Sequence, residues 1–266
     1  MPTKISLGQY IPGDSVIHKM DPRLKIIAVF IYMIGLFLID DFLMFIPVAI
    51  FLAVVLITAK INFKIMLRSL RPLMFIVVFT AILNILMTPG EVLFSFWRIA
   101  VTREGLERAV FMALRIVFLV LGTSILTLTT SAILLTDGIE GVLSPLKIIK
   151  FPAHELAMMI SIALRFIPTL FEEADKIRKA QMARGADFDT GNVFNKAKSM
   201  VPLLVPLFLN SFRRADELAV AMVSRGYRGS EGRTKLNPLK ITGMDIILLC
   251  IVIVVFAGIT AYRYLT

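Results

Sequence analysis

Five long apolar runs constrain this chain more than any other feature of its sequence. They cover residues 24–39, 42–59, 72–88, 106–131 and 244–262. A helix needs roughly 20 apolar residues to cross a hydrocarbon core of about 30 Å, and its backbone groups must be hydrogen-bonded within the core. Because 58% of the 266 residues are hydrophobic, the sequence predicts an all-α integral membrane protein with about five transmembrane helices in the lipid bilayer.

The first run is short for a membrane span. It has sixteen residues, but Arg23 and Lys25 can extend their charges to the interface and relieve the mismatch. A complete crossing is the simplest interpretation. A re-entrant hairpin that turns at Asp40 and Asp41 is the alternative.

The distribution of basic residues predicts the orientation. Residues 145–240 contain sixteen Lys and Arg against nine Asp and Glu, a net +7 of the chain's +10. Short cytoplasmic loops of membrane proteins are rich in Lys and Arg, and the loop between the second and third runs also carries four of them. We therefore expect a multi-pass protein of the cell membrane with a cytoplasmic N-terminus. The basic excess then reflects orientation, and nucleic acid is not expected as a partner.

Three regions follow from this pattern. Residues 1–135 form an N-terminal membrane region with four spans, residues 136–240 form a cytoplasmic module, and residues 241–266 form a C-terminal span. Inside the module, two helical segments begin apolar and end charged. Such helices are expected to lie in or under the membrane plane with their charged ends in water.

The two charged ends are copies of one short pattern. Residues 172–185 recur as residues 213–226, shifted by 41 positions. The shared positions are Asp175, Ala183, Arg184 and Gly185 in the first copy, and Asp216, Ser224, Arg225 and Gly226 in the second. Intervening residues differ, as with Lys176 and Glu217.

An Arg followed by Gly is also an ordinary helix end, with Gly in the left-handed conformation and Arg complementing the helix dipole. Either copy alone would be explained in this way. Recurrence at the same spacing favours two contact points for two similar partners instead. The small residues beside each Arg make a slim tip, and the guanidinium is a rigid donor fork suited to carboxylates or backbone carbonyls.

Other residues of the module have supporting roles in this interpretation. Asp175 and Asp216 precede their Arg by nine residues, too far to reach it along a helix, so we expect them to hold one helix against the other. Arg165 interrupts an apolar stretch and needs a partner. Three methionines form either an adaptable docking face or ordinary apolar filling: Met158, Met159 and Met200.

The sequence offers little catalytic or metal-binding chemistry. His154 and Glu155 lack a third ligand at helical spacing, and Cys250 is the only cysteine, so no metal site is expected. The phosphate-binding loop, the HExxH zinc motif and the GxSxG nucleophile motif do not occur. We therefore expect no cofactor and no ATP hydrolysis by this chain itself.

Taken together, these features resemble the transmembrane T component of energy-coupling-factor (ECF) transporters. The likeness covers essentially the whole chain, including an N-terminal stretch in which Asp21 is the expected N-cap and Pro22 the first residue of a helix. The paired tips at Arg184 and Arg225 are its most specific part. The second tip departs from the usual Ala-Arg-Gly by having Ser224, a change of one small residue for another.

The resemblance implies a complex of four proteins. These are this scaffold, two ATP-binding-cassette (ABC) ATPases, and a small membrane S component that captures a vitamin or metal ion. Arg184 and Arg225 would end coupling helices that insert into the two ATPases. The apolar parts of these helices would form a platform under the S component, with Met158, Met159, Phe166 and Met200 as its expected residues.

Two other classes of protein are weighed against this one. A complete permease with its own substrate path should carry several ionisable residues inside its spans, yet only edge residues such as Arg71 and Arg115 occur there. A membrane-embedded enzyme needs clustered Asp or His, for which Asp40 and Asp41 are too few. The sequence favours an energy-coupling scaffold over both.

Overall fold

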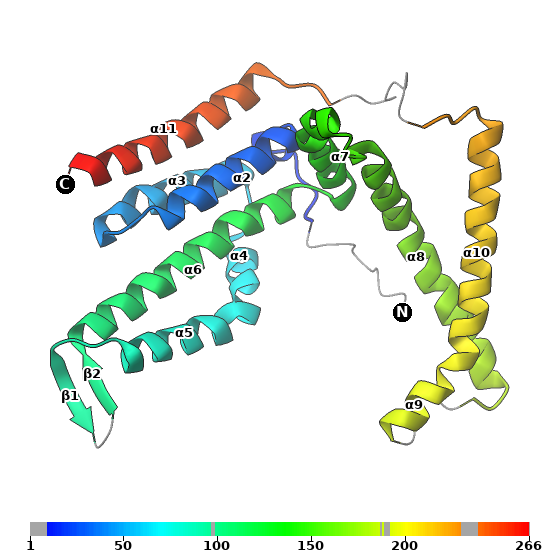
Figure 1. The fold of residues 1–266 in the computed structure, drawn as a ribbon, viewed down its shortest axis with the longest axis horizontal. Coiled ribbons are helices and arrows are strands. Elements are labelled where there is room, and N and C mark those ends of the chain that lie inside the picture. The colour runs from blue at the N-terminus through cyan, green and yellow to red at the C-terminus, as the bar shows by residue number, and fades with distance from the viewer. Residues whose placement is uncertain (1–9, 97–98, 187, 189–191, 230–238, 266) are drawn as a thin grey trace. The chain divides into compact units, whose positions relative to one another are not determined.

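The structure is a computed structural model that describes residues 10–96, 99–186, 188, 192–229 and 239–265. The described chain is helical apart from one antiparallel hairpin of β1 (Val92–Phe96) and β2 (Ile99–Thr102), as Figure 1 shows. The predicted all-α fold is confirmed. The chain divides into two compact units, one of residues 6–142 with 239–266 and the other built on residues 143–238.

The first unit contains all five of the predicted spans. Its helices are α1 (Val16–Lys19), α2 (Pro22–Phe37), η1 (Phe42–Met44), α3 (Phe45–Ala59), α4 (Phe63–Leu70), η2 (Arg71–Leu73), α5 (Met74–Met87), α6 (Arg103–Thr129), α7 (Ala132–Leu143) and α11 (Gly243–Leu265). The second unit contains η3 (Ser144–Ile149), α8 (Ala153–Ala183), α9 (Val193–Ser199) and α10 (Val201–Ser224).

Among the described residues, five helices are long and apolar enough to cross a membrane. Four of them match predicted spans: Phe42–Ala59, Phe63–Met87, Arg103–Thr129 and Gly243–Arg263. The fifth is Ala153–Ala183, instead of the predicted run at 24–39. The reason is length: α2 has 16 residues, about 24 Å at 1.5 Å per residue. By contrast, the apolar first half of α8 continues into a charged second half without a break.

Close helix packing holds the first unit together around Tyr32. The helices α2, α3, α6 and α11 run side by side there (Figure 1), and a Cβ at Gly122 of α6 would overlap the Tyr32 ring. Phe256 of α11 meets the same ring edge-on, and Gly35 of α2 leaves room for Phe256. The Tyr32 hydroxyl donates to the Phe118 carbonyl at 2.6 Å. Small residues thus bring these backbones close, as is typical of membrane helices.

A buried lysine joins the N-terminal motif to the end of α6. Lys25 is 5% exposed, and its Nζ donates to the Thr129 carbonyl at 3.2 Å, the Thr130 hydroxyl at 3.1 Å and the His18 carbonyl at 3.4 Å. Asp21 accepts from the Arg23 backbone N–H at 2.8 Å, and Pro22 begins α2. The predicted cap is confirmed.

Two arginines hold the turn between α2 and α3. Arg263 of α11 pairs with Asp40 at 2.7 Å. Arg115 of α6 donates to the Ile39 carbonyl and lies over the Phe111 ring. The charged turn at Asp40 is therefore paired with α11.

Candidate functional site

Two long helices of the second unit carry the repeated segments. With 31 and 24 residues, α8 and α10 extend about 46 and 36 Å. Both begin apolar and end charged, as predicted. Each contains an internal proline, Pro168 or Pro206, which removes one helical hydrogen bond without ending the helix.

The first tip is a Schellman helix end. The Gly185 N–H donates to the Met182 carbonyl at 3.0 Å, and the Ala186 N–H donates to the Gln181 carbonyl at 3.0 Å. Gly185 has φ +88°, and Arg184 is the last residue before it. The pattern uses carbonyls that a helix end otherwise leaves unpaired.

The second tip repeats the same geometry. The Gly226 N–H donates to the Val223 carbonyl at 2.9 Å, and the Tyr227 N–H donates to the Met222 carbonyl at 3.0 Å. Gly226 has φ +76°. Each hydrogen bond occurs 41 positions after its counterpart, so the two copies agree in conformation as well as in sequence.

Both tips are open. Ala183, Arg184 and Gly185 are exposed, and so are their three counterparts at 224–226. Nothing lies within 4 Å of a Cβ built on Gly185 or Gly226, so these glycines are required by their backbone conformation and not by crowding. Within the described part of the chain, neither Arg184 nor Arg225 forms an ion pair. Each guanidinium is therefore available to an outside acceptor.

The two helices cross in an antiparallel arrangement. Glu173 of α8 accepts from the Asn210 side chain at 2.6 Å and pairs with Arg214 at 3.4 Å. Further along α8, Gln181 donates to the Pro202 carbonyl at 3.4 Å. Residues later in α8 thus contact residues earlier in α10. The C-terminal tips therefore lie at opposite ends of the helix pair, as Figure 1 shows.

The crossing point is also the centre of the repeat. Glu173 and Arg214 are 41 positions apart, the same offset that relates the tips, so equivalent positions of the two copies meet. Each tip Arg lies 11 residues beyond its crossing residue, about 17 Å of helix. An approximate two-fold relation therefore places the guanidiniums symmetrically about the Glu173–Arg214 pair.

Comparison with known proteins assigns the family. The model of the CbiQ family, described as "Cobalt transport protein", matches residues 13–236, which include both tips. The chain belongs to the CbiQ family. Among curated relatives, the "Energy-coupling factor transporter transmembrane protein EcfT" of Thermosediminibacter oceani is 53% identical over 243 residues, which cover 91% of this chain and 92% of the relative.

Other EcfT proteins agree. That of Ruminiclostridium cellulolyticum is 49% identical over 260 residues, 98% of this chain and 97% of the relative. That of Bacillus subtilis is 47% identical over 240 residues, 90% and 91% of the two chains. This CbiQ-family chain is therefore a T component of an ECF transporter, a multi-pass membrane subunit, as its sequence predicted.

The structure does not bring Asp175 or Asp216 into the contact between α8 and α10 of this T component. Asp175 pairs with Lys179 in its own helix at 2.6 Å, and Asp216 is exposed. Both carboxylates point away from the crossing because the residues two positions earlier, Glu173 and Arg214, occupy the facing side. Arg165 is exposed and makes no ion pair with any described residue.

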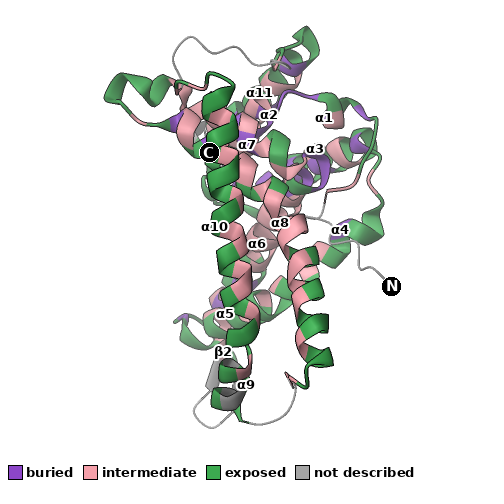
Figure 2. Cartoon of the chain, turned by 90° about the vertical axis from the view of Figure 1, so that its right-hand side faces the viewer, coloured by how far each residue is buried: buried purple, intermediate pink, exposed green. Residues whose placement is uncertain are grey.

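The predicted platform residues of this CbiQ-family chain are partly open. Met159 and Met200 are 54% and 52% exposed, while Met158 is half-buried. Phe166 is half-buried beneath the Arg214 guanidinium, 5.8 Å from its ring centre. Figure 2 shows exposed surface along α10, where a row of large apolar side chains is uncovered: Val201, Leu204, Val205, Phe208, Leu209 and Phe212.

Sequence reasoning missed the residues that join the two helices. Glu173, Asn210 and Arg214 supply the contact, yet each looks like an ordinary charged or polar position on a solvated helix. A signal was present: equivalent positions of the two copies carry opposite charges at 173 and 214. Among the described residues, no group of acidic, His or Cys side chains is arranged to hold a metal ion.

Proposed function

We propose that this T component transmits ATP-driven movement of two ATPase subunits to a membrane S component that binds a micronutrient. The observation that carries the proposal is the pair of matching Arg tips, Arg184 and Arg225, related symmetrically about one crossing point. ATP hydrolysis belongs to the partner subunits, and this chain acts as the scaffold between them and the S component. The names of its relatives, transmembrane proteins of energy-coupling factor transporters, support this proposal.

Each tip is suited to a shallow groove on an ATPase. The Schellman turn ends the helix abruptly, and the small residues beside Arg184 and Arg225 leave the backbone accessible. The guanidinium fork can then bind carboxylates or backbone carbonyls with several hydrogen bonds. Because both tips present the same surface, they are suited to two ATPases that are related to each other.

The apolar row on α10 is suited to an S component. Its side chains recur at spacings of three and four residues, which places them on one helix face, and they are uncovered in this chain. An exposed apolar face of this size marks an interaction surface. Met200 directly precedes this row, and Met159 is an exposed residue near the apolar start of α8. Methionine side chains adapt their shape to a partner.

Movement passes between these surfaces through the crossing. When the ATPases close on ATP, they draw the two tips together, and the helices rotate about the contact of Glu173 with Asn210 and Arg214. The apolar face of α10 turns with its helix. The S component seated on that face is thereby tilted, and its site is opened for release.

Charge reversal tests the tips. In the reconstituted four-subunit complex, Arg184→Glu combined with Arg225→Glu should reduce uptake at least tenfold and release the ATPases during purification, because it puts carboxylates where cations are required. Lys176→Glu on the same exposed side of α8 is the matched control and should leave uptake within about twofold. Full uptake by the double variant would refute the assignment.

Cross-linking tests the platform separately. In a Cys250→Ser background, cysteines at Met159 and Leu209 should form disulfides with cysteines scanned along an S component, while a cysteine at Lys196 on α9 should not. If the tip variants fail in uptake and no platform pair cross-links across the scan, the S component docks elsewhere and this half of the proposal is wrong.

A further inference from the structure

A short basic helix begins one candidate membrane span of the first unit. This helix, α4, begins after Asn62, whose side chain accepts from the Lys64 N–H at 3.0 Å. Its inner face is fixed to the unit, because Met66 is fully buried and Ser69 is hydrogen-bonded to Ser124 of α6 at 3.1 Å. One face of α4 is therefore committed to packing, and the opposite face is open.

The open face of α4 and the first residue of η2 together carry three cations, which we name the α4 basic stripe: Lys64, Arg68 and Arg71. Their spacing of four and three residues places them on one side of the helix. All three are exposed, and within the described chain none forms an ion pair. Residues 42–90 contain no Asp or Glu, so no acidic neighbour in the sequence is available to neutralise the stripe.

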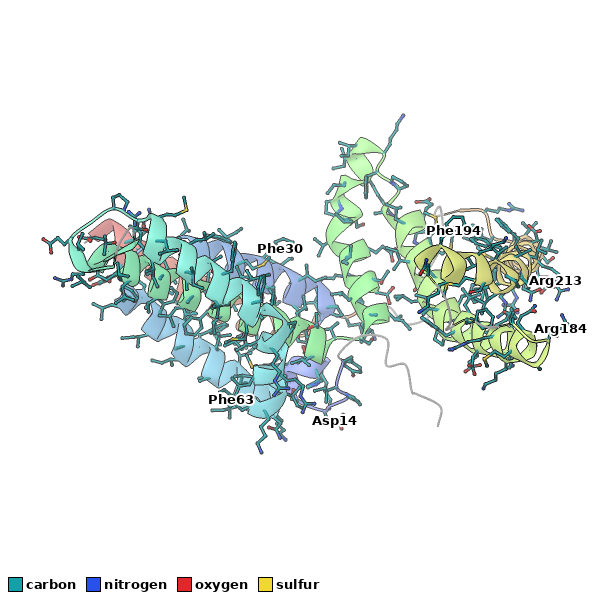
Figure 3. All side chains as sticks on the ribbon, turned by 90° about the horizontal axis from the view of Figure 1, so that it is seen from below. Asp14, Phe30, Phe63, Arg184, Phe194 and Arg213 are labelled. Carbon is teal, nitrogen blue, oxygen red and sulfur yellow. The ribbon has the colours of Figure 1, made fainter. Side chains whose placement is uncertain are left out.

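Large apolar side chains flank the stripe. Phe63 and Leu67 are 61% and 47% exposed, and Figure 3 labels Phe63 at the edge of the unit. A helix that presents cations beside uncovered aromatic and aliphatic groups is typical of the membrane interface. A purely aqueous surface would leave Phe63 in water without compensation.

The position of α4 along the chain agrees with an interfacial site. The preceding helix α3 ends at Lys60 in a left-handed conformation, with φ 54°, and α5 begins after the η2 turn that contains Pro72. The candidate spans on either side of the turn at residues 60–62 are Phe42–Ala59 and Phe63–Met87, so α4 is the first part of the second span. Its eight residues therefore lie at the end of that span, next to this turn, where a membrane helix meets the interface.

We propose that the α4 basic stripe binds the phosphate groups of anionic phospholipids in the adjacent leaflet, with Phe63 and Leu67 inserted among their acyl chains. Charge complementarity supplies the attraction, since anionic leaflets attract basic residues within a Debye length. An acidic protein surface would satisfy the cations but not the two apolar side chains. The lipid satisfies both.

Lipid retention by the purified full chain tests the stripe. The chain in detergent is mixed with equal amounts of phosphatidylglycerol and phosphatidylcholine of the same acyl length, and bound lipids are counted by native mass spectrometry. Wild type should retain phosphatidylglycerol preferentially. The variant Lys64→Gln/Arg68→Gln/Arg71→Gln should lower that preference at least tenfold, since each cation near an anionic surface contributes about fivefold.

Two further variants serve as controls. Lys176→Gln/Lys196→Gln/Lys198→Gln removes the same charge from the second unit and should change the preference less than twofold. Lys64→Arg/Arg68→Lys/Arg71→Lys keeps the charge and should retain the preference, which separates loss of lipid binding from loss of folding. An unchanged preference in the neutralised variant, or an equal loss in the second-unit variant, would overturn the proposal.

Two other ligands are distinguished in the same experiment. Glycerol 3-phosphate should not displace bound phosphatidylglycerol, because it lacks acyl chains for Phe63 and Leu67, and displacement would assign the stripe to free phosphate. Loss of ATPase co-purification in the neutralised variant, with phosphatidylglycerol preference retained, would assign it to a protein partner. Either result would overturn binding of a lipid.

Discussion

Glu173 and Arg214 occupy equivalent positions in the two copies of the repeat, and they pair with each other where α8 crosses α10, with 3.4 Å between Oε2 and Nη2. An internal repeat whose equivalent residues meet has an approximate two-fold axis through the contact. Arg184 and Arg225 lie at equal distances from this contact along their helices, so the same axis relates them. The contact between Glu173 and Arg214 therefore determines the symmetric placement of the two tips.

Glu173→Ala should loosen this crossing. The change removes the partner of both Asn210 and Arg214, and we expect a loss of about 1–3 kcal/mol in stability because hydrogen bonds to charged groups are the stronger ones. Thermal unfolding in detergent measures the loss. Asp175→Ala, which removes only an exposed pair with Lys179, should cost about 0.5 kcal/mol or less. Equal losses would contradict the role of Glu173.

The exchanged pair Glu173→Arg/Arg214→Glu should recover part of the stability lost in Glu173→Ala. The positions are equivalent, so the ion pair can form with its charges reversed. A double-mutant cycle isolates the coupling. Recovery is limited by Asn210. Its side-chain amide now donates to the Glu173 carboxylate, and it would have to rotate to offer its oxygen to a guanidinium at position 173.

Substitution of the tip glycines should strain the helix ends. Gly185→Ala and Gly226→Ala place a Cβ on backbones with φ +88° and +76°, at a cost of about 1 kcal/mol each. Hydrogen exchange at 185–186 and at 226–227 should quicken. Asn tolerates this conformation better, so Gly185→Asn should exchange more slowly than Gly185→Ala. Gly243→Ala, in open space without a positive φ, should leave exchange at both tips unchanged.

Enlarging Gly122 should separate α2 from α6. A Cβ there overlaps the Tyr32 ring, and we expect Gly122→Leu to destabilise the chain by about 1–3 kcal/mol or more through overpacking. A Cβ at Gly258 on α11 meets nothing within 4 Å, and Gly258 is exposed, so Gly258→Leu should be close to neutral. Thermal unfolding of the two variants in one detergent gives the comparison, and similar melting temperatures would show that the Gly122 contact yields without cost.

Removing the charge of Lys25 should weaken the junction of α2 and α6. Lys25→Met keeps the length of the side chain but leaves the Thr129 carbonyl without its donor, and an unpaired buried group costs about 1–3 kcal/mol. Lys19→Met, at an exposed position of α1, is the matched change. In denaturation experiments, Lys25→Met should be less stable than Lys19→Met. Equal stability of the two variants would mean that water replaces the Lys25 donor.

Most of the fold could be predicted because it depends on local patterns. Apolar runs of sufficient length specify membrane helices, and Asp21 followed by Pro22 specifies a helix start, since both effects act within one or two turns. The predicted span at residues 24–39 is not among the candidate spans of the described chain, because its helix of 16 residues is short for a membrane crossing. Orientation of the N-terminus stays a prediction from the basic loops.

The tips were predicted for a similar reason, and the contacts of the helices that carry them were not. A Gly after Arg184 or Arg225 fixes a helix end through its own backbone freedom, so the sequence by itself determined two capped, cationic ends of equal form. The sequence also determined membership of the T-component family, through the spacing of those ends. Which carboxylate faces the other helix depended on how α8 and α10 cross. Asp175 and Glu173 are equally acidic, and only the tertiary structure decided that Glu173 meets Asn210 and Arg214, because a rotation of 200° along the helix separates the two side chains.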